Sequence, residues 1–397
     1  MHVFNDSPVL AAMLHWLRAP SIWVWLVMAF AVARLVHTFI HRLRDYQADL
    51  ALALKHGCEM PPELTKKWPL GIDRIKQLWE TNADGHLLAF LCSIAKDYDG
   101  RNNLCQYLLF GPRAYHILHP ANVATLLSTN FRDYGFGCRP AVFAPLLGNG
   151  IFTQEGEAWR HSRELLRKQF MRAKYQQLEG SFSEHVGNLL DCIPASGVVD
   201  LQPLFFSLTL DTTTALLFGR SVYSLRANID QAVENRDFAN SFELAQEGLA
   251  KRFRIAPFHF LYNPTDFRLA CKTVHSFVEK YIRQTRLAEI EAKRNAGADG
   301  SNMTTTWFID QVAAESDSET DLRDQLLNVL LAGRDTTACC LSWMFRLLVR
   351  HPPAMARLRS EVALAMRGET HPGREQIRKM PFLSCVIKES MFHSLDV

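Results

Sequence analysis

The sequence predicts a mainly α-helical chain with a small β-sheet near its front, preceded by a single membrane-spanning helix. Apolar residues recur three and four positions apart through most of the chain after residue 117, which is the period of an α-helix. One pair of apolar runs flanks a turn dipeptide, as in a strand pair. One segment near the amino end is apolar and almost free of charge, as in a membrane span.

Composition places the chain among globular proteins with a large core. Hydrophobic residues make up 48% of the 397 residues and charged residues 21%. The formal net charge of +3 is too small to indicate binding to nucleic acid, so we expect no nucleic-acid partner. Nine cysteines form no C-x-x-C pair and no Cys/His cluster with zinc spacing, so we expect reduced thiols and no metal site of that kind.

Residues 20–40 predict a membrane anchor. This segment contains one charge, Arg34, and about 20 apolar residues cross a bilayer as a helix. Arg42 and Arg44 follow the segment and only Arg18 precedes it, so positive charge places its carboxyl side in the cytosol. A signal peptide and an interfacial helix are the alternatives. No small-residue cleavage site follows, which counts against the signal peptide.

The anchor is expected to span residues 1–45. Residues 46–72 contain Pro61-Pro62, which favours an extended, stiff linker. The globular domain is then expected to occupy residues 73–397.

Two kinds of pattern define the elements of that domain. Asn102–Ile117 predicts the strand pair, with its turn at Gly111-Pro112. Asn295–Asn302 is small and polar and predicts a loop. Helical periodicity is clearest in four segments: His161–Gln177, Phe205–Phe218, Asp266–Arg294 and Asp321–Arg350.

The last of these segments predicts one helix about 45 Å long at 1.5 Å per residue. Ser318 offers a capping hydroxyl at its start, and Pro352 and Pro353 end it. Leu326–Leu331 is apolar on nearly all sides, so this helix should run through the inside of the domain.

Ala332–Thr337 places poor helix formers in the middle of that helix. Its sequence is Ala-Gly-Arg-Asp-Thr-Thr, and glycine costs about 1 kcal/mol relative to alanine there. Threonine hydroxyls can bond back to carbonyls four residues earlier and bend a helix. We therefore expect a carboxylate, a hydroxyl and a gap left by glycine to sit together inside the core, where they could serve oxygen chemistry that needs a proton relay. A packing glycine with a kink and an exposed aspartate explains the hexapeptide equally well.

This hexapeptide resembles the central-helix motif of the cytochrome P450 family, A/G-G-x-D/E-T-T/S. Leu341-Ser342-Trp343 and Arg350-His351-Pro352 extend the resemblance. It implies a P450-like helical domain in which the helix crosses a haem. It also implies that Asp335 and Thr336 carry a proton relay, and that Ala332 and Gly333 border the pocket for molecular oxygen.

A second stretch agrees with this family. Trp159 and Arg163 form W-x-x-x-R, and residues four apart share one helix face, where both could donate to one carboxylate. Alone this spacing is usually just surface. It resembles the family's second motif, which implies that Trp159 and Arg163 bind a haem propionate.

Other stretches resemble the fungal branch that hydroxylates alkanes and fatty acids. They include Asp133–Gly137, Leu146–Phe152, Leu210–Gly219 and Leu261–Pro264. The resemblance covers most of residues 55–390. By this analogy, the Phe131–Phe152 loop lies over the substrate.

The carboxyl end departs from the family. The third motif, E-x-x-R, begins at Glu389 but has Phe392 in place of arginine. The fourth motif, F-x-x-G-x-R-x-C, is absent. Cys138 follows Phe131 at its spacing, but it lacks the glycine and arginine and precedes the central helix, so we reject it as the iron ligand. The domain is therefore expected to be incomplete at its C-terminus, with no metal ligand assigned.

The resemblance implies a haem-dependent monooxygenase that hydroxylates long aliphatic substrates. Its electrons would come from NADPH through a membrane reductase. We expect a single-pass protein of the endoplasmic reticulum membrane with the domain in the cytosol, and we expect the chain as written to be inactive. The alternative is a non-catalytic membrane helical protein, derived from such an enzyme, that binds a lipid or a protein partner.

Overall fold

The computed structural model describes residues 22–108, 113–172, 175–226, 232–256, 258–295, 308–313, 318–366, 368 and 372–393. The chain divides into two compact units. One consists of residues 1–75 and 100–122, and the other of residues 76–99 and 123–397. Each unit is described by itself below.

The small sheet belongs to the first unit. Strands β1 (Asn103–Tyr107) and β2 (Arg113–Ile117) pair antiparallel, with Cys105 opposite Tyr115. Leu104 and Cys105 are buried in the middle of β1. The strand pair expected within residues 102–117 is therefore confirmed, and its expected turn at Gly111-Pro112 lies outside the described residues.

Helix α2 (Ile22–His56) is the long amino-terminal helix of the same unit. Its apolar side chains are exposed, and its stretch from Val24 is long and apolar enough to cross a membrane by length and composition. The helix runs past the segment expected to span the membrane. Asp49 near its carboxyl end pairs with Arg113 of β2 at 3.0 Å.

The remaining helices lie mainly in the second unit, and two of them, α3 and α5, cross its boundary with the first. Their bounds are α3 Ile72–Ala83, α4 Leu87–Asp97, α5 Pro120–Ala124, α6 Arg139–Leu147, α7 Gly156–Arg172, α8 Tyr175–Asp191, α9 Leu201–Phe218, α10 Ala232–Arg254, α11 Thr265–Asn295, α12 Phe308–Ala313, α13 Glu319–Arg350, α14 Pro352–Met366, α15 Arg374–Arg378 and α16 Pro381–His393. Four short 3-10 or π segments join them: η1 Pro69–Gly71, η2 Thr125–Thr129, η3 Phe131–Asp133 and η4 His259–Leu261.

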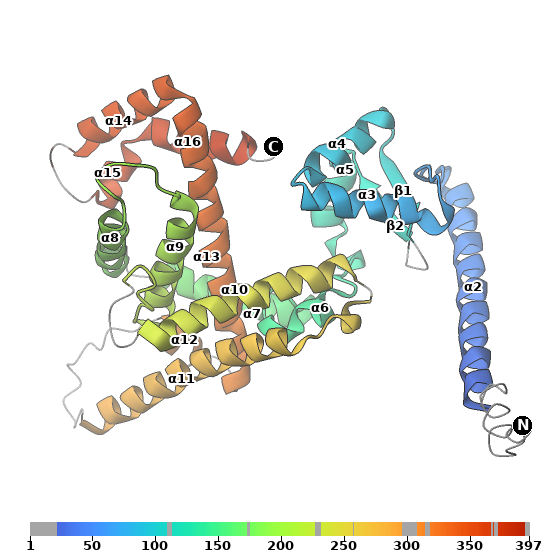
Figure 1. Ribbon diagram of the computed structural model, residues 1–397, viewed down its shortest axis with the longest axis horizontal. Coiled ribbons are helices and arrows are strands. Elements are labelled where there is room, and N and C mark those ends of the chain that lie inside the picture. Colours follow the sequence, from blue (N-terminus) through green and yellow to red (C-terminus); the bar gives the residue numbers. More distant parts are fainter. Residues whose placement is uncertain are drawn as a thin grey trace, which may run out of the picture. The chain divides into compact units, whose positions relative to one another are not determined.

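Helix α13 organises the second unit (Figure 1). Helix α9 lies along it, α10 packs on α11, and α14 and α16 pack near its carboxyl end. The main core gathers buried side chains from α6, α7 and α9 to α13, among them Phe238, Phe242 and Phe267 at 0 to 1% exposure. Burial of this apolar surface is the main force that holds the helices together.

The predicted fold class, mainly helical with a small sheet, is confirmed. Three of the four expected helices match α9, α11 and α13 to within a few residues. The fourth, His161–Gln177, falls on α7 and the start of α8, and its residues 173–174 lie outside the described residues. The loop expected after Asn295 lies outside the described residues.

Candidate functional site

The first half of α13 is buried, as its apolar sequence predicts. Leu326, Leu327 and Leu330 are fully buried. The Ser318 hydroxyl accepts a hydrogen bond from the Asp321 amide and caps the helix start. This half fixes the position of the segment Ala332–Thr337 that follows it.

Thr336 lies on the exposed side of α13. Its hydroxyl donates to the Ala332 carbonyl at 2.7 Å, four residues earlier. The expectation that this hydroxyl is enclosed in the core is therefore wrong for the structure described. This hydrogen bond holds the hydroxyl against the preceding turn of α13, which contains the half-buried Ala332 and Gly333.

Asp335 turns towards α10 instead. Successive residues point about 100° apart around a helix, so Asp335 and Thr336 need not face the same space. One carboxylate oxygen of Asp335 accepts from Gln246 Nε2 at 2.8 Å, and the other accepts from Arg334 at 3.0 Å. Burial raises the pKa of this carboxyl, and the charge of Arg334 partly offsets that rise.

Gly333 is where α13 and α9 approach most tightly in this segment. A Cβ atom at Gly333 would lie 2.8 Å from Thr213 Oγ1 and 3.0 Å from its Cγ2. Such distances are tighter than packed side chains tolerate without movement. Gly333 therefore lets α9 and α13 pack closely, and this role does not depend on a ligand beside Ala332.

Sequence reasoning missed Arg334. Its side chain is only 6% exposed and lies against two rings, 4.9 Å from Phe206 and 5.5 Å from Phe242. Gln246 accepts a hydrogen bond from it at 3.0 Å. A charged residue next to a motif position usually faces solvent, so a single sequence carries no signal for this burial.

Trp159 and Arg163 meet on α7, as their spacing predicts. The Arg163 guanidinium carbon lies 5.4 Å from the Trp159 ring, and Phe131 packs against that ring at 5.4 Å. Arg163 is exposed and Trp159 is half-buried. Ser162 and Leu166, three and seven residues after Trp159 on the same side of α7, are buried in the unit.

One hydrogen bond joins α7 to α13. Gln325 Nε2 donates to the Ser162 hydroxyl at 2.6 Å, and that hydroxyl donates to Gln154 at 2.5 Å. Ser162 lies next to Arg163, and Gln325 lies two helical turns before Ala332, or about 10 Å along the axis. The structure thus holds the two motif segments on helices that touch.

The segment Gly148–Phe152 is also fixed to α13. Asp324 accepts from the Asn149 amide at 2.7 Å, and Asn328 accepts from the Phe152 amide at 2.9 Å. A Cβ at Gly148 or Gly150 would fall about 2 Å from these side chains. The wider stretch from Phe131 is not all loop, because α6 lies inside it.

The carboxyl-terminal and cysteine positions complete the survey. Cys138 is exposed at the start of α6. Glu389 is exposed on α16, and the side chain of Phe392 lies outside the described residues. Within the described residues, no group of three or more His, Cys, Asp or Glu side chains is placed to hold a metal ion.

Comparisons with known proteins agree on one family. The family model "Cytochrome P450" matches residues 78–392. A cytochrome P450 of Arthroderma benhamiae is 38% identical over 92% of this chain and 69% of its own length. Cytochrome P450 monooxygenase himC of Aspergillus japonicus is 36% identical over 71% of this chain and 50% of its own length. Cytochrome P450 52A13 of Debaryomyces hansenii is 35% identical over 85% of this chain and 66% of its own length.

The solved structures give the same fold. A cytochrome P450DA haem domain superposes with a TM-score of 0.64 over 83% of this chain and 69% of that chain, at 18% identity. The chain thus spans between half and about two thirds of the length of the curated relatives described above.

Proposed function

Because the chain belongs to the cytochrome P450 family, we propose that it forms part of a haem-dependent monooxygenase site. The observation that carries the proposal is the pairing of two motif segments on packed helices, Ala332–Thr336 on α13 and Trp159–Arg163 on α7. The chain spans only part of its relatives' length, so the activity belongs to this proposal.

The side chains present fit the edge and one face of a haem. Arg163 is an exposed cation next to a half-buried indole, and both can donate to a propionate. Ala332 has a small side chain and Gly333 has none, so no large side chain fills the turn before Thr336. A bound haem would supply the oxygen chemistry, and protein residues would orient it and control protons.

Asp335 and Thr336 are the proposed proton carriers. Burial raises the pKa of Asp335, which favours a carboxyl that holds a proton longer than a surface aspartate does. The Thr336 hydroxyl is exposed on the open side of α13 and could pass a proton outward. Since the two side chains point different ways, Asp335 must leave Gln246 to reach Thr336.

Haem binding tests the α7 pair without any measurement of turnover. Arg163→Gln should weaken haem binding about tenfold, the loss of one charge-assisted bond. Haem would be titrated into the protein in detergent and followed by its absorbance and by quenching of tryptophan fluorescence. Arg160→Gln is the matched control, because Arg160 is an exposed neighbour that pairs with Glu157. Equal affinities of both variants would contradict the assignment.

We further propose that residues 1–397 alone do not bind haem iron through a thiolate. The sequence has no F-x-x-G-x-R-x-C motif, and Cys138, at its spacing from Phe131, has tyrosine and phenylalanine where the motif has glycine and arginine. Reduction and carbon monoxide should therefore give no strongly red-shifted Soret band, which is the sign of thiolate ligation. If that band appears, the proposal is wrong, and Cys138→Ser is the first variant to examine.

The intact protein is proposed to hydroxylate long-chain aliphatic substrates, alkanes or fatty acids. The resemblance to the fungal alkane- and fatty-acid-hydroxylating branch supports this, with relatives of the 52 group at 32 to 35% identity. Electrons would come from NADPH through a reductase in the same membrane. Helix α2 would anchor the protein in the endoplasmic reticulum membrane, with the helical domain in the cytosol.

Product analysis tests the substrate class. A version of the protein that extends beyond residue 397 would be incubated with reductase, NADPH and a C12 to C18 alkane or fatty acid. Hydroxylated chains that depend on NADPH would support the proposal. If that version binds a lipid but forms no product, it is instead a non-catalytic lipid-binding relative.

A further inference from the structure

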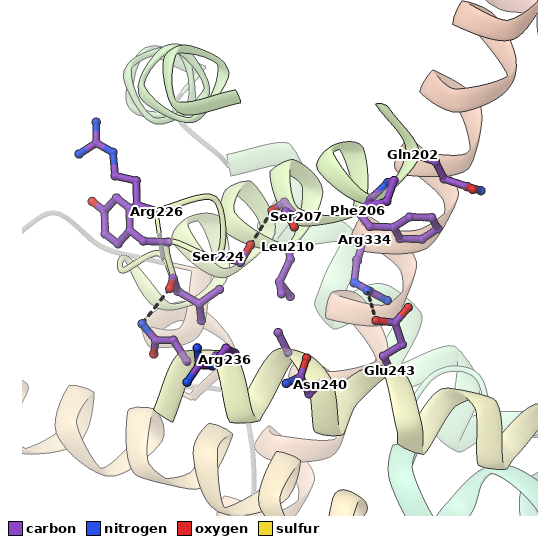
Figure 2. A pocket seen from close by; sticks show the side chains of 15 residues that line it. Gln202, Phe206, Ser207, Leu210, Ser224, Arg226, Arg236, Asn240, Glu243 and Arg334 are labelled. Atoms are coloured by element: carbon purple, nitrogen blue, oxygen red, sulfur yellow. Dashed lines mark hydrogen bonds and ion pairs between the residues drawn. The ribbon is translucent and has the colours of Figure 1, made fainter. Parts of the chain in front are cut away.

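A cavity of about 480 Å³ lies in the second unit between α9 and α10 (Figure 2). Helix α9 and the segment after it form one wall, α10 forms the other, and α13 contributes only Arg334. Among the residues that line the cavity, none is Ala332, Gly333, Thr336, Trp159 or Arg163. Nothing derived above assigns it a role.

The charge on the lining is unbalanced. Three guanidinium groups line the cavity, those of Arg226, Arg236 and Arg334, against a single carboxylate, Glu243. Figure 2 shows Arg334 and Glu243 together at one end and Arg226 at the other. An anion that enters the cavity therefore meets a net positive surface.

Arg334 is the buried member of this set. Its side chain is 6% exposed, and its Nε has no hydrogen-bond acceptor among the described residues. Asp335 accepts from its Nη1 at 3.0 Å, whereas Glu243 lies 3.9 Å away, beyond hydrogen-bond distance, and is 73% exposed. A buried cation with an unused donor is costly, so an acceptor at this end would relieve an existing deficit.

Part of the remaining lining is suited to a short apolar body, alongside polar side chains such as Ser207 and Asn235. Phe206, Leu210, Val222 and Ala239 supply apolar surface. Figure 2 shows Leu210 pointing from α9 into the space above α10. Asn240 is a polar group on the α10 side, next to the exposed Arg236 four residues before it.

We propose that this cavity binds a small organic monocarboxylate with a short aliphatic body. The ligand carboxylate accepts from the unpaired Nε of Arg334, while Asp335 keeps its ion pair with the same guanidinium and Glu243 stays in solvent. Arg236 supplies a second positive charge, and the aliphatic body packs on Phe206 and Leu210. The residues that carry this proposal lie on α9, α10 and α13, and none of them is proposed to touch the haem.

Hexanoate is the probe, titrated into the full chain in detergent and followed by calorimetry. Hexanol is the uncharged match, and inorganic phosphate is an anion without the apolar body. Hexanoate should bind at least tenfold more tightly than either, since it alone satisfies both parts of the cavity. Equal binding of hexanol, or tighter binding of phosphate, would overturn the proposal.

Two variants should shift the hexanoate affinity in opposite directions. Arg236→Gln should weaken it about tenfold, because one charge-assisted contact is lost. Glu243→Gln should strengthen it severalfold, because the competing carboxylate is removed. Glu247→Gln is the control, since Glu247 lies one turn further along α10 and pairs with Lys251. An unchanged affinity in Arg236→Gln, or a weaker one in Glu243→Gln, would refute the site.

Discussion

At the scale of single residues, the central motif combines a packing requirement with a chemical one. Gly333 lets α9 approach α13 at Thr213, whereas Asp335 turns towards α10 and Thr336 is exposed. The structure thus supports the explanation of a packing glycine. The proton relay through Asp335 and Thr336 stays a proposal.

Gly333→Ala tests the packing role. Alanine gains about 1 kcal/mol in helix propensity but overpacking costs about 1–3 kcal/mol, so the variant should be less stable by about 1 kcal/mol. In a Thr213→Ala background the two crowding atoms are absent, and the same substitution should become stabilising. Urea unfolding of the parent, the two single variants and the double variant gives the free energies of a double-mutant cycle. An effect of equal sign in both backgrounds would show that Thr213 is not the obstacle.

Much of the candidate site could be predicted from sequence, because its signals are local. Spacing alone places Trp159 and Arg163 in contact, and capping chemistry identifies Ser318. The burial of Arg334 could not be predicted, since it depends on Phe206 and Phe242 of other helices. For the same reason, the exposure of Thr336 follows from which faces of α13 its neighbours cover.

His185 should make stability depend on pH. It is 1% exposed, and burial lowers its pKa below 6.5, with Arg226 adding to the lowering while Asp211 and Glu184 oppose it. The unfolded chain binds a proton at a higher pH than the folded chain does. The contribution of the neutral His185 to the free energy of unfolding is therefore fully present above about pH 6.5. It is lost as the pH drops towards the lowered pKa, by up to about 1.4 kcal/mol per pH unit.

The measurement is the free energy of unfolding of His185→Gln between pH 5 and 8. The variant should lose part of the acid-side slope, because one group that titrates only after unfolding is gone. His161→Gln is the control, since His161 is exposed on α7. A slope that is the same in His185→Gln and the parent would mean that His185 is protonated in the folded chain.

At the scale of elements, α13 is the helix to which several other segments are hydrogen-bonded. Its buried polar side chains Asp324, Gln325 and Asn328 each bind a different partner, and two of them hold Gly148–Phe152. Arg323 donates twice to Asp324 and also pairs with Glu279 of α11. These bonds explain polar residues that interrupt an otherwise apolar run.

Asn328→Ala should loosen the segment Gly148–Phe152. Asn328 is fully buried, accepts from the Phe152 amide and donates to the Leu147 carbonyl at 2.9 Å. Its loss leaves buried backbone groups without partners, a cost of about 2–3 kcal/mol. Hydrogen exchange should show faster exchange at Phe152, with Asn240→Ala on α10 as the exposed control. Unchanged protection of that amide would contradict the anchoring role.

The sequence predicts the end of a helix best where a proline or a glycine follows it. Pro352 ends α13, and Gly219 in a left-handed conformation ends α9. Neither glycine nor proline occurs within His161–Gln177, so its periodicity predicts one helix, which the described residues on either side of 173–174 are consistent with in α7 and α8.

At the scale of the whole molecule, α2 is longer than a bilayer is thick. Its 35 residues extend about 52 Å, against about 30 Å of hydrocarbon. Charged residues gather in its second half, and Asp49 there pairs with Arg113, whose guanidinium also donates to Tyr115 at 3.0 Å. The second half of α2 is therefore tied to the small sheet by this ion pair, and the apolar first half is the part that we propose to cross the membrane.

Cysteine labelling in sealed microsomes tests this orientation. Cys58 follows α2 directly and is exposed, so a variant that keeps only this cysteine should react with a membrane-impermeant maleimide without permeabilisation. A single-cysteine variant with Asn5→Cys should react only after the membrane is opened, if Arg42 and Arg44 hold the other end in the cytosol as proposed. Protection of Cys58 would mean the reverse orientation. Labelling of both positions in sealed vesicles would mean that α2 lies along the membrane surface, because a spanning helix must separate its two ends.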